Sequence, residues 1–169
     1  MNEILNKEPV ERVRKKLEEF DKSLKIVLLE STARTAIDAA KSLNTEVGSI
    51  VKSLLLRTKS SYLLCLIAGD KKCSLNKLKK ILKEKDLSMA SANEVKEVTG
   101  FTIGGVSPIG HLKDIKVYID NSLSRFETIY AAAGHPHCIF KISFEEIKQI
   151  TSGSAMDISE WKIDRKSVV

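Results

Sequence analysis

The spacing of apolar residues along the chain switches between the helical and the strand period. Pro9 can start a helix, because a proline in the first turn loses no hydrogen bond, and Val10, Val13 and Leu17 then share one face. Residues 25–29 follow as a predicted strand. This alternation of periods indicates a mixed α and β structure.

A second helix is predicted after residue 30, with Ser31 or Thr32 as its N-cap and Asn44 at its end. Its apolar stripe is narrow, which suits close packing on a sheet. The stripe consists of Ala33, Ala36, Ile37, Ala40 and Leu43.

Two apolar runs, residues 53–58 and 62–68, flank a short polar turn and predict a β-hairpin that is buried on both sides. Further strands are predicted over residues 115–119, 128–133 and 138–142. Together these strands should form a mixed sheet that is curled enough to hold a pocket.

Three more helices are predicted in the middle and near the end of the chain. Two begin at capping boxes, in which a serine and a glutamate three residues later exchange hydrogen bonds with the backbone. These boxes are Ser91 with Glu94 and Ser143 with Glu146. The apolar face of the remaining helix consists of Leu75, Leu78, Ile81 and Leu82.

The segment TGFTIGGVSPIG, residues 99–110, follows neither period. Gly104 and Gly105 can adopt positive φ and let a ligand approach their amides, while Pro108 stiffens the exit of the turn. The spacing matches neither the Walker loop nor the dinucleotide-binding loop. Taken alone, the segment is either a ligand-binding loop or an ordinary tight connection.

Composition favours one domain without a membrane segment. A chain of 169 residues, 43% of them hydrophobic, can bury a sizeable core. We place the domain at residues 1–153 and expect residues 154–169 to form a loosely docked tail with Trp161 as its one possible anchor. The longest apolar run, residues 62–68, is far shorter than the ~20 residues that span a bilayer, and the N-terminus lacks an apolar signal core. A cytoplasmic location is therefore expected.

Cysteine and histidine spacing predicts neither disulfides nor a metal site. The three cysteines have no C-x-x-C spacing and lie in or beside apolar segments, which favours reduced structural thiols. His135 and His137 would point to opposite faces of an extended segment. No metal or other cofactor is expected.

The formal net charge of +6 favours a polyanionic partner. Seven lysines fall within the fifteen residues 71–85, around the helix with the Leu75 face. They form either a solvated helix face or a contact with an RNA backbone, which would supply salt-dependent affinity with little sequence information. The candidate RNA contacts are Lys72, Lys77, Lys79, Lys80 and Lys83.

An ordered set of five segments resembles the YbaK/ProX-type aminoacyl-tRNA deacylases, which are free-standing relatives of the editing insertion domain of bacterial prolyl-tRNA synthetases. The segments are TAIDAA, IVKSLLL, GGVSPIG, AAAGHPH and SFEEIKQIT. The resemblance covers about residues 31–153. It implies a single α/β domain of the α+β kind, in which helices flank a curled, barrel-like mixed sheet.

The resemblance also implies a reaction, the hydrolysis of a small amino acid wrongly esterified to the 3′ adenosine of a tRNA, chiefly proline tRNA. Ester hydrolysis needs a positioned water and a place for the developing oxyanion. The enzyme would act in trans on aminoacyl-tRNA, with prolyl-tRNA synthetase or an elongation factor as candidate partners.

The resemblance makes Lys52 the essential lysine of the family. Because an unperturbed lysine has a pKa near ~10.4, it is a poor base, and we expect Lys52 to position the acceptor phosphate or the ester. Without the resemblance, Lys52 would be read as a helix-end lysine whose stem lies on the core. Gly104 and Gly105 complete the candidate catalytic group, because their amides can hold the carbonyl region or the terminal adenosine.

The candidate substrate-binding residues are Val106, Ser107, Pro108, Gly134, His135, Arg34 and Ser53. His135 replaces the basic Lys-Arg type turn expected in relatives that act on cysteine-charged tRNA, and it resembles the insertion domains and the alanine-directed members. The alternative is an exposed imidazole in a simple turn. Since no Ser/His/Asp arrangement is evident, we favour attack by a water that is assisted by a ribose hydroxyl of the substrate.

Two other function classes stay open. A non-catalytic tRNA-binding or synthetase-binding module would use the lysine-rich face and the glycine loop without hydrolysis. A small-molecule esterase would leave the basic helix without a role and would normally show a stronger nucleophile or metal signature.

Overall fold

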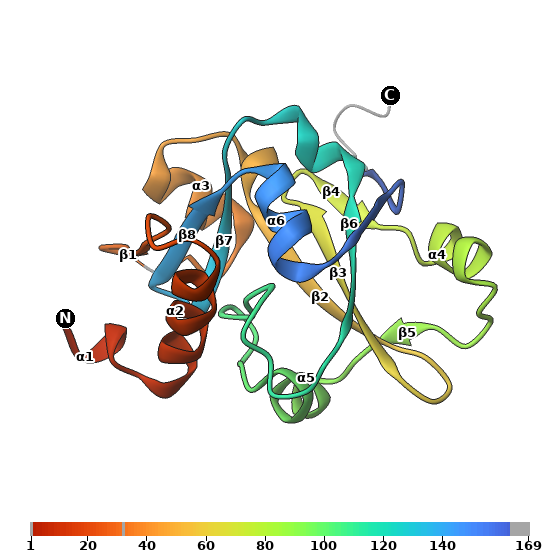
Figure 1. The fold of residues 1–169 in the computed structure, drawn as a ribbon. Coiled ribbons are helices and arrows are strands. Elements are labelled where there is room, and N and C mark those ends of the chain that lie inside the picture. The colour runs from red at the N-terminus through yellow and green to blue at the C-terminus, as the bar shows by residue number, and fades with distance from the viewer. Residues whose placement is uncertain (1, 32, 163–169) are drawn as a thin grey trace.

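The computed structural model describes residues 2–31 and 33–162 (Figure 1). Its largest sheet has five strands in the order β5-β2-β3-β6-β9. The strands are β2 (Val51–Arg57), β3 (Tyr62–Ala68), β5 (Ser88–Met89), β6 (Lys116–Asp120) and β9 (Ser154–Met156). β2 and β3 form the predicted hairpin, and the sheet is mixed because β6 runs parallel to β3.

Two smaller sheets complete the β structure. Antiparallel strands β1 (Ile26–Leu28), β8 (Cys138–Ile142) and β7 (Ile129–His135) form one, and β10 (Ser159–Trp161) pairs with β4 (Lys71–Cys73) in the other. A single parallel bridge from Ile50 to Tyr130 joins the edge of β2 to β7. Within the described ranges none of the three sheets closes on itself, so the predicted barrel-like core is not confirmed.

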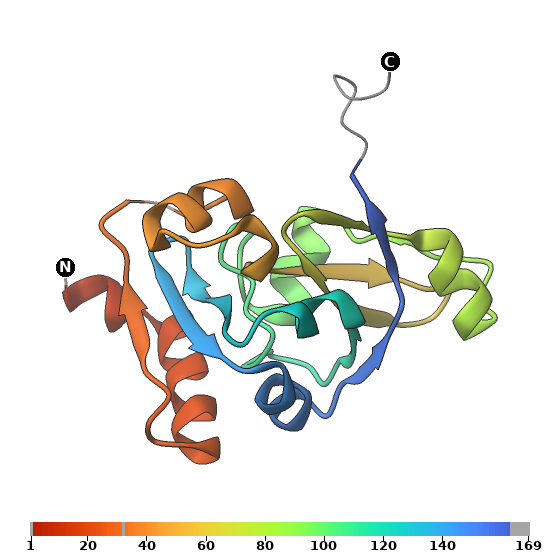
Figure 2. The same ribbon diagram turned by 90° about the horizontal axis from the view of Figure 1, so that it is seen from above.

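Six α-helices and two short 3-10 helices surround these sheets in the described part of the chain. The α-helices are α1 (Asn2–Leu5), α2 (Glu8–Phe20), α3 (Ala36–Leu43), α4 (Leu75–Leu82), α5 (Ala92–Thr99) and α6 (Phe144–Thr151). The 3-10 helices are η1 (Val47–Ser49) and η2 (Asn121–Arg125). Seen from above, α2 and β1 lie at one end of the molecule and α4 lies at the other (Figure 2). No helix of the described residues is long and apolar enough to span a membrane.

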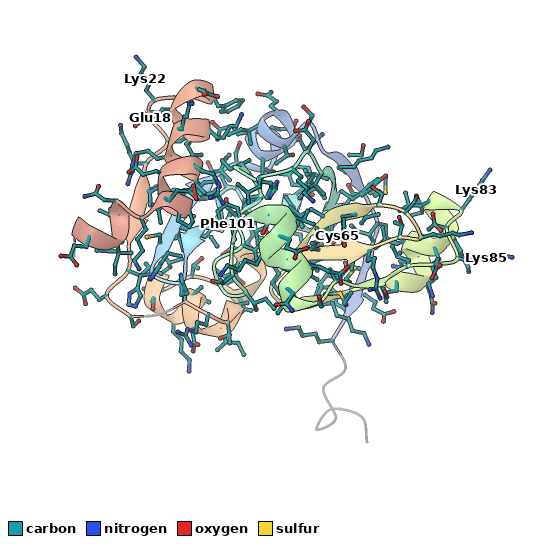
Figure 3. All side chains as sticks on the ribbon, turned by 90° about the horizontal axis from the view of Figure 1, so that it is seen from below. Glu18, Lys22, Cys65, Lys83, Lys85 and Phe101 are labelled. Atoms are coloured by element: carbon teal, nitrogen blue, oxygen red, sulfur yellow. The ribbon has the colours of Figure 1, made fainter. Side chains whose placement is uncertain are left out.

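Both faces of the hairpin are buried, as the sequence predicts. Val51 and Leu55 of β2 belong to the main core, together with residues of α2, β7 and β8, whereas Leu56 packs with Leu78 of α4 on the other face. Figure 3 shows Phe101 and Cys65 inside the molecule. This two-sided burial explains why the strands read as continuous apolar runs.

Several helix ends follow their local signals. Both capping boxes form, with Ser91 capping α5 and Ser143 capping α6. Asn44 ends α3 in the left-handed conformation, at φ 53°. These ends are fixed by contacts within a few residues, which is why a sequence pattern predicts them.

The start of α3 differs from the prediction. The helix begins at Ala36, because the Thr35 side chain accepts a hydrogen bond from the Asp38 amide at 3.1 Å. Ser31 is not its cap, and Thr32 lies outside the described residues. Ile37 is 53% exposed rather than part of a buried stripe. On α4, Ile81 is likewise exposed although it was expected on the apolar face.

The segment after residue 153, expected as a loosely docked tail, forms β9 and β10 as far as residue 161. Asp120 anchors it, since this buried carboxylate accepts hydrogen bonds from the Ile158 amide at 2.9 Å and the Ser159 hydroxyl at 2.8 Å. Trp161 lies in β10 and is 60% exposed. Residues 163–169 lie outside the described part.

Candidate active site

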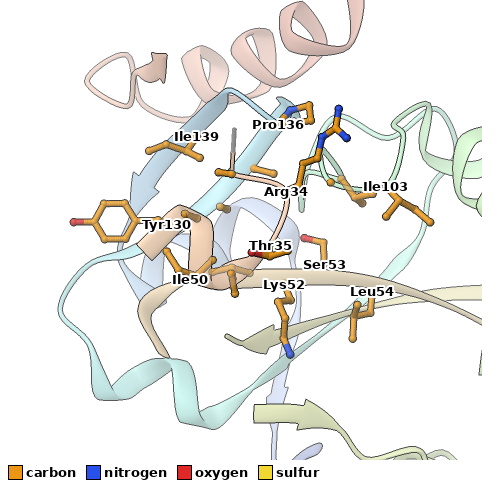
Figure 4. A pocket seen from close by; sticks show the side chains of 18 of the residues that line it. Arg34, Thr35, Ile50, Lys52, Ser53, Leu54, Ile103, Tyr130, Pro136 and Ile139 are labelled. Atoms are coloured by element: carbon orange, nitrogen blue, oxygen red, sulfur yellow. The ribbon is translucent and has the colours of Figure 1, made fainter. Parts of the chain in front are cut away.

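A cavity of about 450 Å³ lies where the start of α3, strand β2, the glycine loop and the turn between β7 and β8 meet (Figure 4). Most of its lining residues are apolar, and no Asp or Glu is among the described residues that form it. Its polar and charged residues include Arg34, Thr35, Lys52, Ser53, His135 and Lys162. A largely apolar cavity with a few polar groups is typical of a site for a small ligand.

Gly104 and Gly105 have different positions in the glycine loop. Gly104 lines the cavity with φ at 97°, and it packs beside the side chains of Arg34 and Pro136. Gly105 is buried behind it, and a Cβ at this position would lie 3.0 Å from both Cα and N of His135. The Gly105 amide donates to the Thr102 carbonyl at 3.0 Å. That amide is therefore engaged within the loop, whereas no intramolecular partner of the Gly104 amide is found in the described chain.

Ser107 and Pro108 shape the loop without lining the cavity. Both are buried, and the Ser107 carbonyl shares a hydrogen bond with Nε2 of His111 at 2.7 Å. Burial lowers the pKa of His111, so the ring is neutral at pH 7 and donates this bond from Nε2. Val106, between the glycines and Ser107, does line the cavity.

Helix α2 braces the glycine loop from outside the cavity. Arg12 donates from Nε to the Gly110 carbonyl at 2.9 Å and from Nη2 to the Thr99 carbonyl at 3.1 Å. Its guanidinium also lies 4.8 Å from the ring centroid of Phe101. These contacts hold both ends of the loop to a single side chain.

Gly134 lets the end of β7 approach the same helix. Its φ is 91°, and a Cβ there would lie 2.8 Å from the carbonyl carbon and oxygen of Pro9. Gly134 does not itself line the cavity. Its role in the structure is to bring His135 into place between α2 and the glycine loop.

Lys52 is the second residue of β2. The sequence predicts that this strand begins at residue 53, so the observed strand begins two residues earlier and includes Lys52. Its Nζ donates to the carbonyl of Lys71 on β4. In Figure 4, Lys52 and Leu54 point to one side of β2 and Ser53 points to the other. Burial, together with the nearby charge of Lys162, lowers the pKa of Lys52 to about 8. Lys52 is still mainly protonated at pH 7.

Ser53 carries a buried hydroxyl that has no hydrogen-bond partner among the described residues. Its oxygen points toward Thr35 in Figure 4. A buried polar group without a partner costs roughly 1–3 kcal/mol, and a ligand that supplies the partner recovers this energy. The hydroxyl is therefore suited to contact a ligand in the cavity.

His135 is held in one tautomer by its own turn. Nδ1 accepts a hydrogen bond from the His137 amide at 3.0 Å. Partial burial, together with the neighbouring His137, Lys7 and Arg34 side chains, lowers the pKa of His135, so the ring is neutral at pH 7. The neutral ring then carries its proton on Nε2, which can donate to a ligand. Figure 4 shows Arg34 beside Pro136 in the cavity lining. The Ala33 amide donates a hydrogen bond to the Pro136 carbonyl at 2.8 Å, which joins the segment before α3 to this turn.

None of the five candidate RNA-contact lysines lines the cavity. Lys72 pairs with Glu160 at 3.2 Å, and Lys77 donates to Asp157 at 2.9 Å and to the Ser159 carbonyl at 2.7 Å. Lys79, Lys80 and Lys83 make no ion pair within the described ranges. Figure 3 shows Lys83 and Lys85 at the outer tip of the molecule.

Sequence reasoning missed several cavity residues. Met89, Ile103 and Tyr130 were not singled out, and Lys162 reaches the cavity because β10 pairs with β4. The described residues contain no group of three or more His, Cys, Asp or Glu side chains that could hold a metal ion.

The fold and this cavity define a mixed α and β domain with a small-ligand site built on a glycine loop. Residues 30–150 match the model of the aminoacyl-tRNA editing domain, and the chain belongs to this family. It is 31% identical over 140 residues to the uncharacterized protein YwhH of Bacillus subtilis, covering 82% of this chain and 88% of that protein.

Other similar proteins carry functional names. The chain is 29% identical to EbsC of Enterococcus faecalis, a proposed Cys-tRNA(Pro)/Cys-tRNA(Cys) deacylase, over 74% of this chain and 77% of EbsC. A crystal structure described as a proposed trans-editing enzyme for prolyl tRNA synthetase superposes with a TM-score of 0.86 and 34% identity, covering 91% and 98% of the two chains. The predicted resemblance to the YbaK-type editing family is therefore confirmed.

Proposed function

We propose that this protein is an aminoacyl-tRNA deacylase that acts in trans. It removes a small noncognate amino acid from tRNA, and its main substrate is mischarged proline tRNA. The observation that carries the proposal is the cavity of about 450 Å³, with apolar walls and a glycine loop whose Gly104 amide has no hydrogen-bond partner among the described residues. Membership of the editing family and the names of its relatives support it.

The chain's polar groups favour positioning of the ester rather than proton abstraction. The cavity lining contains no carboxylate in the described part, and Lys52 is mainly charged at pH 7. We assign the Gly104 amide and the Nε2 proton of His135 to the developing oxyanion or the terminal adenosine. Gly105, whose own amide is engaged, keeps the loop close to His135.

The substrate itself supplies the route for the proton. Water forms a bond to the ester carbonyl carbon, and the bond from that carbon to the ribose 3′ oxygen breaks. The water's proton passes through the neighbouring ribose hydroxyl to the 3′ oxygen, so that free amino acid and tRNA result. Lys52 and Lys162 supply positive charge on the wall of the cavity, where they can hold the acceptor phosphate or the ester in place.

Cavity size sets the choice of amino acid in this proposal. One methylene changes binding in an apolar pocket by only ~1–3 kcal/mol, so small side chains such as alanine, serine, cysteine and threonine are separated weakly by volume alone. The Ser53 hydroxyl adds a polar contact to this selection. Prolyl-tRNA synthetase or an elongation factor, in the cytoplasm, would then contribute further recognition of the tRNA.

The test follows loss of the ester from proline tRNA charged separately with alanine, cysteine, serine and proline. Rapid loss of one noncognate ester, reduced about 100-fold or more in Lys52→Ala while the tRNA still binds, is the expected result. Lys22→Ala is the matched control, because Lys22 is an exposed lysine that neither lines the cavity nor belongs to the candidate RNA contacts, and it should leave kcat unchanged. Circular dichroism confirms that the variants are folded.

Survival of every ester would count against hydrolysis. The next panel would then be other tRNAs charged with serine, alanine or threonine. Tight tRNA binding without hydrolysis in both panels would replace this proposal with the non-catalytic binding module. Hydrolysis of simple free esters with no preference for aminoacyl-tRNA would instead indicate a small-molecule esterase.

A further inference from the structure

Trp161 is the single tryptophan of the chain and is unusually open to solvent for such a large apolar side chain. It lies in β10 directly opposite Lys71 of β4, and 60% of its surface is exposed. The Lys71 ammonium lies 4.4 Å from the centroid of the indole ring. The Arg125 guanidinium, from η2, lies 5.3 Å from the same centroid. These cations hold the ring in place while much of it faces solvent.

The charge around Trp161 is positive but partly compensated. Asp70 accepts two hydrogen bonds from Arg125, at 2.9 and 2.8 Å, and fixes that guanidinium beside the ring. Lys71 and Lys162 make no ion pair with any residue of the described chain. The patch therefore combines an exposed aromatic face with two ammonium groups that form no ion pair within the described residues.

The patch is continuous with the cavity. Lys162 follows Trp161 in the chain, lines the cavity and donates to the Gly69 carbonyl at 3.0 Å. Lys52, on the cavity wall, donates to the carbonyl of Lys71, whose side chain contacts the indole. Trp161 is therefore joined to the cavity lining through two residues, its chain neighbour Lys162 and its cross-strand partner Lys71.

We propose that Trp161, with Lys71 and Lys162, is a stacking platform for an unpaired nucleotide of the RNA 3′ end whose terminal, esterified nucleoside occupies the cavity. Aromatic rings that stack bases and cations that hold phosphates are the two parts of single-strand binding sites. This inference rests on the proposed function for its substrate. It adds a contact outside the five segments on which the resemblance was based.

The fluorescence of Trp161 provides a direct test, because no other tryptophan contributes to the emission. The full chain is titrated with a four-nucleotide single-stranded RNA of the sequence ACCA and, separately, with a blunt RNA duplex. Saturable quenching by the single strand, stronger than by the duplex, is the expected result. No quenching by the single strand, or equal quenching by the duplex, would overturn the proposal.

Variants of Trp161 test the stacking contact directly. With a fluorescently labelled ACCA strand, Trp161→Ala should raise Kd about tenfold, whereas Trp161→Phe should stay close to the parent. Ile81→Ala is the matched control, since Ile81 is also an exposed apolar residue but lies on α4. An unchanged Kd in Trp161→Ala would overturn the platform.

The deacylation assay distinguishes failure of this inference from failure of the proposed function. A raised KM with unchanged kcat in Trp161→Ala supports both. Hydrolysis with an unchanged KM overturns the platform alone. Quenching and loss of affinity in Trp161→Ala without any hydrolysis uphold the platform and overturn the deacylase activity.

Discussion

Replacement of Lys52 by methionine should stabilise the protein at neutral pH, although it removes a charge that we assign to the site. Burial in the cavity wall and the charge of Lys162 lower the pKa of Lys52 from 10.5 to about 8. One pKa unit corresponds to ~1.4 kcal/mol, so the folded chain disfavours this charge by at most ~3 kcal/mol. Because Lys52 is only half-buried, solvent screening reduces the effect to roughly 1–2 kcal/mol. Loss of the hydrogen bond to the Lys71 carbonyl offsets part of this, which leaves a net gain of about 1 kcal/mol.

The gain in unfolding free energy of Lys52→Met over the parent should decrease as the pH rises. Below pH 8 the folded and the unfolded chain both carry the Lys52 proton, and the destabilisation is constant. Between pH 8 and 10.5 the folded chain has released the proton and the unfolded chain has not, so the stability of the parent protein rises with pH. The advantage of Lys52→Met over the parent should therefore be largest near pH 7 and almost absent near pH 10.

Urea unfolding followed by circular dichroism, at about pH 7 and about pH 10, measures this difference. Lys80→Met is the control, because Lys80 is exposed, and its free energy of unfolding should differ from the parent by less than about 0.5 kcal/mol at both pH values. A Lys52→Met variant that is less stable than the parent at pH 7, or equally favoured at both pH values, would refute the reasoning. A more stable variant that no longer hydrolyses the ester would show that Lys52 is kept for function at a cost in stability.

Three further predictions test the surroundings of the cavity. Gly105→Ala should lose roughly 1–3 kcal/mol of unfolding free energy and lower kcat/KM, because its Cβ would meet the His135 backbone at 3.0 Å; a urea midpoint equal to the parent's would contradict this. Arg12→Ala should lose roughly 1–3 kcal/mol in the same assay, since two loop carbonyls lose a charged donor, and unchanged stability would mean that α2 does not brace the loop. Iodoacetamide should modify Cys73 first in the native protein, because Cys73 is half-buried while the other two thiols are fully buried with raised pKa values; peptide mass spectrometry that found Cys138 first would contradict this burial.

Local signals predicted the elements that local contacts fix. The hairpin of β2 and β3 and the capping boxes at Ser91 and Ser143 depend on residues a few positions apart, and all are present. The predicted start of α3 was wrong, because Ser31 and Thr32 are residue types that commonly cap helices. The N-cap is Thr35, and the Ala33 amide donates a hydrogen bond to the Pro136 carbonyl in the turn after β7. That bond joins segments about 100 residues apart, and no local pattern encodes it.

The cavity shows the same division between near and distant contacts. The glycine loop, Lys52 and His135 were found from sequence because each stands in a recognisable segment. Lys162 was not, because β10 has only three residues, too few for a period to appear, and its position depends on pairing with β4. The engagement of the Gly105 amide by Thr102 was also invisible, since it depends on the conformation of the loop rather than on its composition.

Helix α2 connects these observations, because it lies outside the segment that matches the family and still determines the shape of the site. The match covers residues 30–150, whereas the Arg12 side chain holds both ends of the glycine loop and Pro9 leaves room only for a glycine at position 134. A larger residue at 134 would push the end of β7, and with it His135, away from α2. The geometry of the family's glycine loop in this chain is therefore set partly by residues that the family pattern does not contain, and substitutions in α2 should act on the cavity without touching the ligand.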